Sequence, residues 1–294
     1  MQKVWLCLLV LSFVYILGTS CAFAAPHSKG SPPGRAILLV AFGTSVPDAQ
    51  KAFDNIDDQA RKAFPGVEIR WAFTSSTIRA KLAKEGKHLD SPEVALARLM
   101  EAGYTHVAVS SLHVIPGEEF HDLNRNVQLF SRMAGGLERA LVASPLLSSH
   151  DDMVRVAKAL LKHAPRQRNA DEAVLFMGHG SRKHPSDAIY SAMNYLIQDL
   201  SPNVFIATVE GHPNLDEILP KLSRKGIKKA RLAPLMVVAG VHARDDMMGD
   251  DPESWKSVLS RNGIACEATL AGIAEYPEIV EVWLDHLRET FAQL

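Results

Sequence analysis

Residues 36–45 read AILLVAFGTS, and residues 173–181 read AVLFMGHGS. Each stretch is an apolar run that ends in a turn containing glycine and serine. An apolar run without alternation is typical of a strand that is buried on both faces of a parallel sheet. The glycine and serine residues mark the point where the chain turns away from the sheet. These two stretches therefore favour an α/β fold with helices on both faces of a parallel sheet.

The same pattern occurs in both halves of the chain. LVAFGTS at 39–45 aligns with LFMGHGS at 175–181, and LHVIPG at 112–117 aligns with LMVVAG at 235–240. The period of about 120–136 residues is the size of a domain rather than of a solenoid repeat. We therefore expect two similar Rossmann-like domains, each with a parallel sheet flanked by helices, and an active-site cleft between them.

The N-terminus has the pattern of a cleaved secretory signal. Lys3 precedes the apolar run 4–17, and small residues follow and end in Ala22-Phe23-Ala24. The apolar run is too short for a good membrane span. We expect residues 1–24 to be removed on export to the periplasm and residues 25–35 to form a flexible leader.

The remaining chain is expected to divide into an N-terminal α/β domain at 36–150 and a C-terminal α/β domain at 151–294 that carries the metal site. The last helix is expected to pack back on the first domain. After signal cleavage Cys266 is the only cysteine left, which excludes an intramolecular disulfide and a thiolate zinc site. The 33 acidic and 32 basic residues argue against nucleic acid as a partner.

Three strand ends in the second half each deliver a potential metal ligand. His179 follows the apolar letters VLFM, Glu210 follows IATV, and His242 follows LMVVAGV, which overlaps the end of a strand expected at 230–238. The carboxyl ends of parallel strands meet at one edge of a sheet, so we expect these three side chains to converge. Two imidazoles and a carboxylate suit Co, Fe, Ni or Zn and leave coordination positions open. His212 is an alternative third ligand, and hydrogen bonding without a metal is the other interpretation.

The residues around these ligands resemble one known family. GHGS at 178–181, VEG at 209–211 and GVHARDDM at 240–247 are similar to the sirohydrochlorin cobaltochelatases, which belong to the class II tetrapyrrole chelatases. LLVAFGTS at 38–45 matches too, and the resemblance extends from Ala36 to the C-terminus. It implies insertion of Co(II), as the substrate metal, into sirohydrochlorin with release of two protons and without an organic cofactor.

The resemblance also implies roles for the three ligands. His179 is expected to be the principal base and a metal ligand, His242 the second ligand, and Glu210 a ligand and proton relay. An imidazole titrates near neutral pH and therefore suits the base. Because metal binding and proton acceptance compete for one lone pair, the roles are sequential or divided between the histidines.

The macrocycle carries acidic substituents that need partners. Arg182 and Arg244 adjoin the expected site and are the preferred candidates for binding them. Phe42, Thr44 and Ser45 occupy the first-half turn that corresponds to GHGS, and we expect them to line the opposite wall.

Several alternatives remain open at this stage. His121, at the start of an expected helix, is a candidate ligand for a second metal or a haem, and an ordinary helix-face histidine is its other interpretation. Insertion of Fe(II) to give sirohaem uses the same ligand types. A periplasmic carrier of metal or tetrapyrrole without catalysis is a further possibility. We expect a homo-oligomer, as for most soluble enzymes, and no stable membrane insertion.

Overall fold

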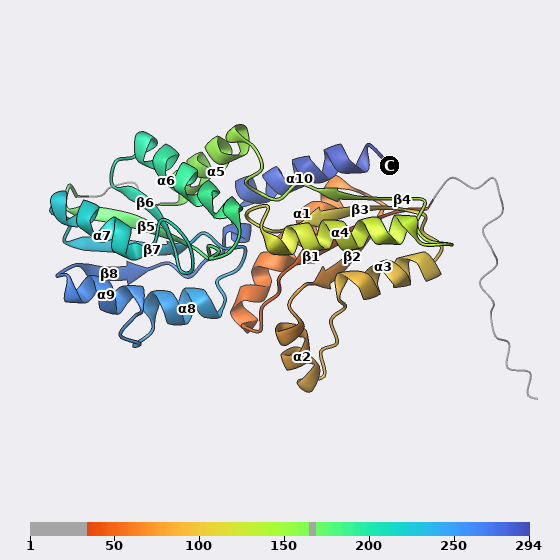
Figure 1. Ribbon diagram of the computed structural model, residues 1–294, viewed down its shortest axis with the longest axis horizontal. Coiled ribbons are helices and arrows are strands. Elements are labelled where there is room, and N and C mark those ends of the chain that lie inside the picture. The colour runs from red at the N-terminus through yellow and green to blue at the C-terminus, as the bar shows by residue number, and fades with distance from the viewer. Residues whose placement is uncertain (1–33, 165–168) are drawn as a thin grey trace, which may run out of the picture. The chain divides into compact units, whose positions relative to one another are not determined.

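The computed structural model describes residues 34–164 and 169–294, and these form two parallel sheets (Figure 1). The first sheet consists of β1 (Arg35–Ala41), β2 (Glu68–Phe73), β3 (His106–Ser111) and β4 (Arg139–Ala143). The second consists of β5 (Glu172–Gly178), β6 (Val204–Thr208), β7 (Lys229–Pro234) and β8 (Ala265–Ala268). The strand orders β2-β1-β3-β4 and β6-β5-β7-β8 are the same topology, and every pairing is parallel. The predicted α/β class with two similar units is confirmed.

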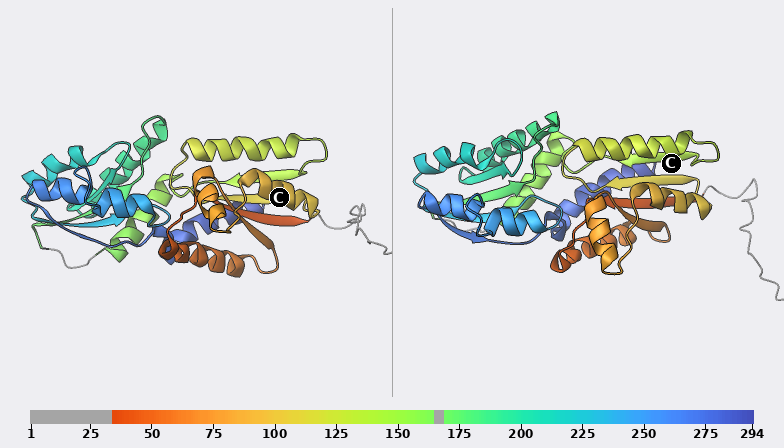
Figure 2. Two further views of the ribbon diagram at one scale, coloured as in Figure 1. Left: turned by 90° about the horizontal axis from the view of Figure 1, so that it is seen from below. Right: turned by 60° about the horizontal axis from the view of Figure 1, so that its bottom comes forward.

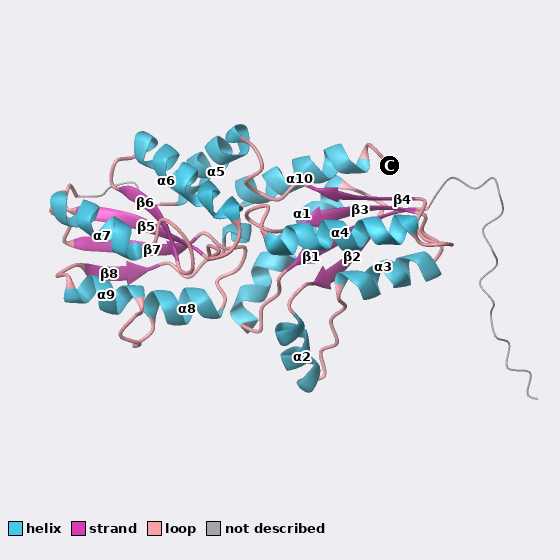
Figure 3. Cartoon of the chain, viewed as in Figure 1, coloured by secondary structure: helices cyan, strands magenta, loops and turns pink. Residues whose placement is uncertain are grey.

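Helices connect successive strands and cover the sheets (Figure 3). The first half contains α1 (Gln50–Ala63), α2 (Ser76–Lys84), α3 (Pro92–Glu101) and α4 (Glu118–Arg132), with the short 3-10 helix η1 (Pro47–Ala49) before α1. The second half contains α5 (His150–His163), η2 (Pro185–Asp187), α6 (Ala188–Leu200), α7 (Leu215–Arg224), α8 (Val241–Met248), α9 (Trp255–Arg261), η3 (Ile273–Glu275) and α10 (Pro277–Phe291).

The unbroken apolar run of β1 is explained by burial on both faces. Ile37 and Leu39 pack in a core with side chains of α1 and α10, whereas Leu38 and Val40 pack with side chains of α3 and α4. The side chains of a strand alternate between faces, so both sets must be apolar. Strand β5 is arranged in the same way, with α5 and α6 on one face and α7, α8 and α9 on the other. Figure 2 shows these helix layers from two further directions.

Helix α10 joins the two halves. It packs against β3, β4 and α1 around the first sheet and also against α5 of the second half. Trp283 of α10 is almost fully buried, and its Nε1–H donates to the carbonyl oxygen of His113 at 3.2 Å. The core that contains Trp283 also includes residues of both sheets. The orientation of the strand ends in the two halves is therefore supported by one continuous apolar core.

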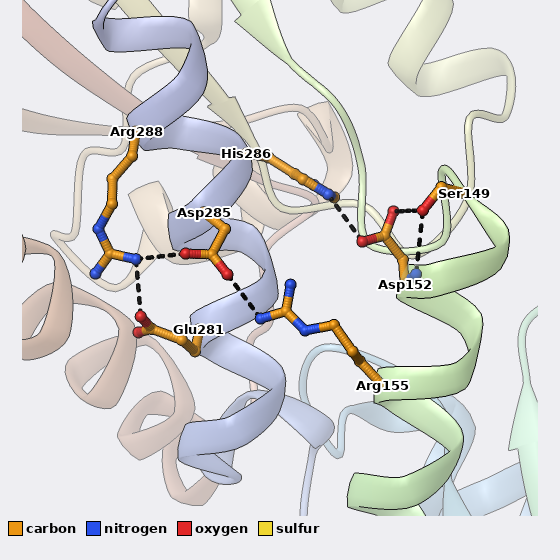
Figure 4. Close-up of polar contacts among 7 residues, drawn as sticks. All are labelled: Ser149, Asp152, Arg155, Glu281, Asp285, His286 and Arg288. Carbon is orange, nitrogen blue, oxygen red and sulfur yellow. Dashed lines mark hydrogen bonds and ion pairs between the residues drawn. The ribbon is translucent and has the colours of Figure 1, made fainter.

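Polar contacts add to the α5–α10 junction (Figure 4). Asp152 of α5 is 6% exposed, and its carboxylate accepts a hydrogen bond from the Ser149 hydroxyl at 2.7 Å and lies 3.2 Å from His286 Nε2. On the outer side, Arg155 of α5 forms an ion pair with Asp285 of α10 at 2.7 Å. Buried carboxylates need such partners, because an unpaired charge in the core is costly.

The strand expected at 230–238 is shorter than predicted. Strand β7 ends at Pro234, and the apolar residues that follow leave the sheet. The carbonyl oxygens of Met236 and Val237 accept hydrogen bonds from Ile273 and Ala274 instead of from a neighbouring strand. Because this detour buries apolar side chains as a strand does, hydropathy does not distinguish the two. His242 consequently lies in the first turn of α8 rather than directly after a strand.

Some expectations concern residues that the structure does not describe. The predicted signal peptide at 1–24 and all but residues 34 and 35 of the predicted leader lie outside the described residues. Among the helices of the described part, none has both the length and the apolar character that a membrane crossing requires.

Candidate metal centre

The imidazoles of His179 and His242 form the centre of the candidate site. His179 follows the last residue of β5, and His242 is the second residue of α8. Their rings meet edge to face, with 4.7 Å between the centroids. The structure therefore brings together the two histidines that the sequence singled out, although they follow different strands of the second sheet.

Hydrogen bonds indicate which ring nitrogen of each histidine is available. His179 Nδ1 lies 3.2 Å from the carbonyl oxygen of Gly180, which can only accept a hydrogen bond. His242 Nδ1 lies 2.5 Å from a carboxylate oxygen of Asp246, one turn further along α8. Both Nδ1 atoms are therefore donors, and each neutral ring keeps its lone pair on Nε2. A backbone or carboxylate partner on the second nitrogen is the usual support of a metal-binding histidine.

Glu210 is close to His179 along the backbone, since its N–H donates to the His179 carbonyl oxygen at 2.8 Å. Its side chain is exposed on the loop after β6. Within residues 34–164 and 169–294, no three His, Cys, Asp or Glu side chains form a ready-made metal site. The expected three-ligand set is thus not assembled here, and Glu210 as third ligand remains a prediction. An exposed glutamate can still rotate toward an arriving metal.

His212, the alternative third ligand, has a different partner. Its Nδ1 lies 2.5 Å from a carboxylate oxygen of Glu217, and this hydrogen bond raises the pKa of His212 above its ordinary value. A carboxylate partner on Nδ1 also supports His242, so this contact does not exclude His212 as a ligand. The choice between Glu210 and His212 remains a prediction.

Glu119, in the first half, is a further acidic residue within electrostatic reach of His179, and the sequence patterns did not single it out. It lies in the first turn of α4, accepts a hydrogen bond from the Thr74 hydroxyl, and is 3.5 Å from His113 Nε2. Burial raises the pKa of Glu119, but His113, Thr74 and the charge of His179 outweigh it and hold the pKa below its ordinary value. Glu119 is therefore a carboxylate at neutral pH, within electrostatic reach of His179.

The internal repeat contains a signal for this residue. The alignment of LHVIPG with LMVVAG places Gly117 opposite Gly240 and hence Glu119 opposite His242. Both glycines are N-cap residues, and both helices begin at the following residue. Glu119 is thus the first-half counterpart of His242, and extending the alignment by two residues would have found it.

The turn after β1 lies opposite the start of α8. A Cβ added to Gly240 would be 3.5 Å from Thr44 Oγ1, which places the two segments in contact. Thr44 is buried, and its hydroxyl accepts a hydrogen bond from Val46 N–H at 3.1 Å. Phe42, in contrast, is 51% exposed, and Val241 at the start of α8 is 46% exposed. The two facing segments therefore each present an apolar side chain to solvent.

The other predicted substrate ligands differ in availability. Ser45 accepts a hydrogen bond from Lys81 Nζ at 3.0 Å. Arg244 forms an ion pair with Asp48 of the first half at 3.3 Å, and its buried Nε has no hydrogen-bond partner. Arg182 is exposed. Of the two arginines, Arg182 is thus the more accessible to an anion.

A pocket of about 510 Å³ lies beside the site and is lined by Arg182 and Asp246. Five carboxylates line it against this one arginine. Its charge therefore favours cations over anions. The carboxylates are Asp216, Asp245, Asp246, Asp251 and Glu253.

His121 of α4 lies near a second histidine. Its ring centroid is 5.1 Å from that of His184, in the loop after β5. His184 Nδ1 accepts a hydrogen bond from Ser186 N–H, so the proton of the neutral ring is on Nε2 and that nitrogen has no lone pair for a metal. A second metal or haem at His121 remains a prediction without a partner ligand in the described residues.

Comparisons with known proteins identify the family of this chain. The cobalt chelatase (CbiK) family matches residues 35–292. The sirohydrochlorin cobaltochelatase CbiKC of Nitratidesulfovibrio vulgaris (strain Hildenborough) is 46% identical over 260 residues, which cover 88% of this chain and 92% of the relative. The sirohydrochlorin cobaltochelatase of Salmonella typhimurium (strain LT2) is 35% identical, over 87% of this chain and 96% of the relative.

Solved structures agree on the fold. SirB from Bacillus subtilis with Fe3+ superposes with a TM-score of 0.60 at 18% identity, covering 88% of this chain and 96% of that chain. CbiX, the terminal enzyme of sirohaem biosynthesis in denitrifying bacteria, superposes with a TM-score of 0.54 at 17% identity, covering 87% and 99%. The family match spans nearly all of the described residues, and the two sirohydrochlorin cobaltochelatases align over most of their own length. The chain therefore belongs to the cobalt chelatase (CbiK) family.

Proposed function

We propose that this protein inserts Co(II) into sirohydrochlorin and releases the two pyrrole N–H protons. The proposal rests on one observation above all, the adjacent imidazoles of His179 and His242 with both Nε2 lone pairs available. Imidazole suits borderline divalent metals such as Co(II), and two neutral imidazoles leave the ion with open positions for transfer to the macrocycle. The activity named for the two sirohydrochlorin cobaltochelatase relatives supports the same reaction.

The reaction requires the site to exchange a cation for two protons. His242 binds the incoming ion through Nε2, with Asp246 holding the ring and adding negative charge behind it. His179 accepts a pyrrole proton at Nε2, since its Nδ1 proton is retained by the Gly180 carbonyl oxygen. The carboxylates of Glu119 and Glu210 are the proposed acceptors for the second proton and its relay to solvent.

The macrocycle needs an apolar surface and contacts to its carboxylates. We place its flat face against Phe42 and Val241, which are exposed on the facing segments after β1 and β7. Aromatic rings gain most from offset stacking on other flat π-systems. Arg182 is the proposed partner of a macrocycle carboxylate.

The visible absorbance of sirohydrochlorin with Co(II), recorded with and without protein, tests this function. We expect the protein to accelerate insertion and His179→Ala to lower kcat by at least about 100-fold, the usual contribution of a general base. His88→Ala is the matched control, because His88 is exposed in the loop between α2 and α3. Equal rates with and without protein would favour a carrier of metal or tetrapyrrole without catalysis. Full activity of His179→Ala would rule out His179 as the general base.

The same assay with Fe(II) in place of Co(II) determines which of the two is the preferred substrate metal. We propose Co(II) as the substrate metal and expect a faster reaction with Co(II) than with Fe(II) at equal free concentration. The ligand types at His179 and His242 accept either ion, so the comparison must be made under anaerobic conditions with both metals. A faster reaction with Fe(II) would favour the sirohaem alternative.

We further propose that the chain works as an exported, periplasmic form and as a homo-oligomer. The export proposal is supported by the charged, apolar and small residues of the N-terminal sequence, which lie outside the described residues. Export separates the enzyme from the cytoplasm without altering the chemistry of the metal centre.

A further inference from the structure

The loops that carry His179 and Glu210 run side by side. Val209 N–H donates to the carbonyl oxygen of Gly178 at 3.0 Å, and Glu210 N–H donates to that of His179 at 2.8 Å. These two bonds continue the β5–β6 ladder beyond the sheet. They end at Glu210, however, so something else must determine how the two loops continue.

The carboxylate of Asp187 bonds both loops just beyond that point. Its Oδ1 accepts a hydrogen bond from Ser181 N–H at 2.9 Å, and its Oδ2 accepts one from His212 N–H at 2.6 Å. Ser181 is two residues beyond His179, and His212 is two residues beyond Glu210. Asp187 is only 8% exposed, so it forms these bonds in a largely dry environment, where charge-assisted hydrogen bonds are strong.

Asp187 is the last residue of η2, which runs directly into α6, and its backbone is helical. The start of η2 is capped by His184, whose Nδ1 accepts a hydrogen bond from Ser186 N–H. The side chain of Asp187 makes no capping bond to α6. Both of its carboxylate oxygens bond the two loops instead.

The glycines of both loops pack closely around the Asp187 carboxylate and its neighbours. A Cβ at Gly211 would lie 2.0 Å from Asp187 Oδ1, and a Cβ at Gly180 would lie 2.6 Å from the Gly211 nitrogen. A Cβ at Gly178 would lie 2.5 Å from the ring of Tyr190, which is buried in the first turn of α6. The space beside these glycines is therefore taken by Asp187, Tyr190 and the neighbouring loop.

We propose that Asp187 is a positioning residue that holds the His179 loop and the Glu210 loop at the distance needed to bind one metal ion. This inference rests on the proposed function. Asp187 does not contact the metal; it acts through the two backbone N–H groups. Without it, the two loops are held together only by the backbone hydrogen bonds of Val209 and Glu210, and the residues beyond them must be ordered again at each metal-binding event.

Co(II) titration followed by visible d–d absorbance tests this role in the full mature protein. We expect Asp187→Asn to weaken Co(II) binding by about 10–100-fold and to alter the absorbance spectrum, the usual scale for a supporting partner of a metal ligand. The amide keeps one acceptor but turns an N–H donor toward a backbone N–H. Asp152→Asn is the matched control, because Asp152 is an equally buried carboxylate, 6% exposed, that bonds Ser149 and His286 away from the metal centre. It is expected to lower Tm without changing the Co(II) spectrum.

A folded Asp187→Asn protein with wild-type Co(II) affinity and spectrum would overturn the proposal. Should that variant fail to fold, Gly211→Ala decides the question, because its methyl group pushes the loop away from an intact carboxylate. Weakened Co(II) binding in Gly211→Ala supports the positioning role of Asp187, and unchanged Co(II) binding overturns it. If Co(II) binding by the His179→Ala variant equals that of the wild type, the proposed function is overturned, and the role of Asp187 with it.

Discussion

The rings of His179 and His242 lie edge to face, 4.7 Å apart between centroids, and both donate their Nδ1 proton to an acceptor of the chain. Two neutral imidazoles at this distance can share one cation through their Nε2 atoms. If both were protonated, two positive charges would be forced together. Metal binding and double protonation therefore exclude each other, and a site of this kind couples arrival of a metal to departure of protons.

Asp246 should contribute to Co(II) affinity through His242. Replacing it in Asp246→Asn keeps a hydrogen-bond acceptor for Nδ1–H but removes the negative charge behind the ring. We expect Co(II) to bind at least about tenfold more weakly, measured by isothermal titration. Asp250→Asn is the matched control, since it removes a carboxylate near the end of α8 that pairs with Lys256 instead. Equal Co(II) affinity of Asp246→Asn and the wild type would contradict the proposed support of His242 by Asp246.

Phe42 should contribute to binding of the macrocycle and should not contribute to Co(II) affinity. Phe42→Ala removes an aromatic ring that is 51% exposed beside the site. We expect about a tenfold higher KM for sirohydrochlorin, since loss of one stacking contact and its buried area amounts to about 1–2 kcal/mol. Co(II) affinity should stay unchanged. Leu129→Ala on α4, where Leu129 is 58% exposed, is the control for loss of an exposed apolar side chain. An unchanged KM in Phe42→Ala would place the macrocycle elsewhere.

The sheets could be predicted because hydropathy reports burial. The runs at β1 and β5 are apolar at every position, and in the structure odd and even side chains enter different cores. The predicted extent of the strand at 230–238 was wrong for the same reason. Leu235 is fully buried and its N–H still bonds Met177 of β5, but the apolar residues that follow it, Met236 and Val237, pair with residues 273–274 instead of with a strand. A segment that is buried outside a sheet has the same apolar sequence as a strand that is buried within one.

The candidate site could be predicted in part. The rule that strand ends meet places His179 and the segment after β7 at the same edge of the sheet. It does not account for the contact itself, because His242 lies beyond the end of β7, in the first turn of α8. Glu119 was missed because the alignment of the two halves stopped at Gly117, two residues before it. Its distance from His179 depends in addition on how the two halves face each other, which one sequence does not state. Asp187 was missed because a buried carboxylate that bonds two backbone N–H groups has no distinctive sequence pattern.

Glu278 should make the α5–α10 junction sensitive to acid. A hydrogen bond from Lys162, and then one from His163, lowers the pKa of Glu278 from 4.5 to about 2. A lowered pKa in the folded state means that the contribution to stability is complete above about pH 4.5 and is lost as pH falls toward 2. The pair is partly exposed, so we expect less than about 1 kcal/mol.

Urea unfolding of wild type and Glu278→Gln between pH 7 and pH 2.5 measures this contribution. The wild type should be more stable at pH 7, and the difference should shrink as the pH falls. Glu101→Gln, an exposed change at the end of α3, is the control and should not show this convergence. A difference that persists unchanged at pH 2.5 would contradict the assignment.

The N-terminal sequence should direct export with cleavage after Ala24. When the full chain is expressed in a Gram-negative host, we expect the periplasmic fraction to contain a protein that begins at Ala25, identified by intact mass and N-terminal sequencing. Leu9→Arg places a charge inside the apolar run 4–17, which export requires to be uncharged, and should leave the full-length chain in the cytosol. Lys51→Arg, a change that keeps the charge in the folded part, is the control and should be exported. Recovery of uncleaved wild-type chain from the cytosol alone would refute export, while Co(II) insertion by that chain would leave the metal centre as proposed.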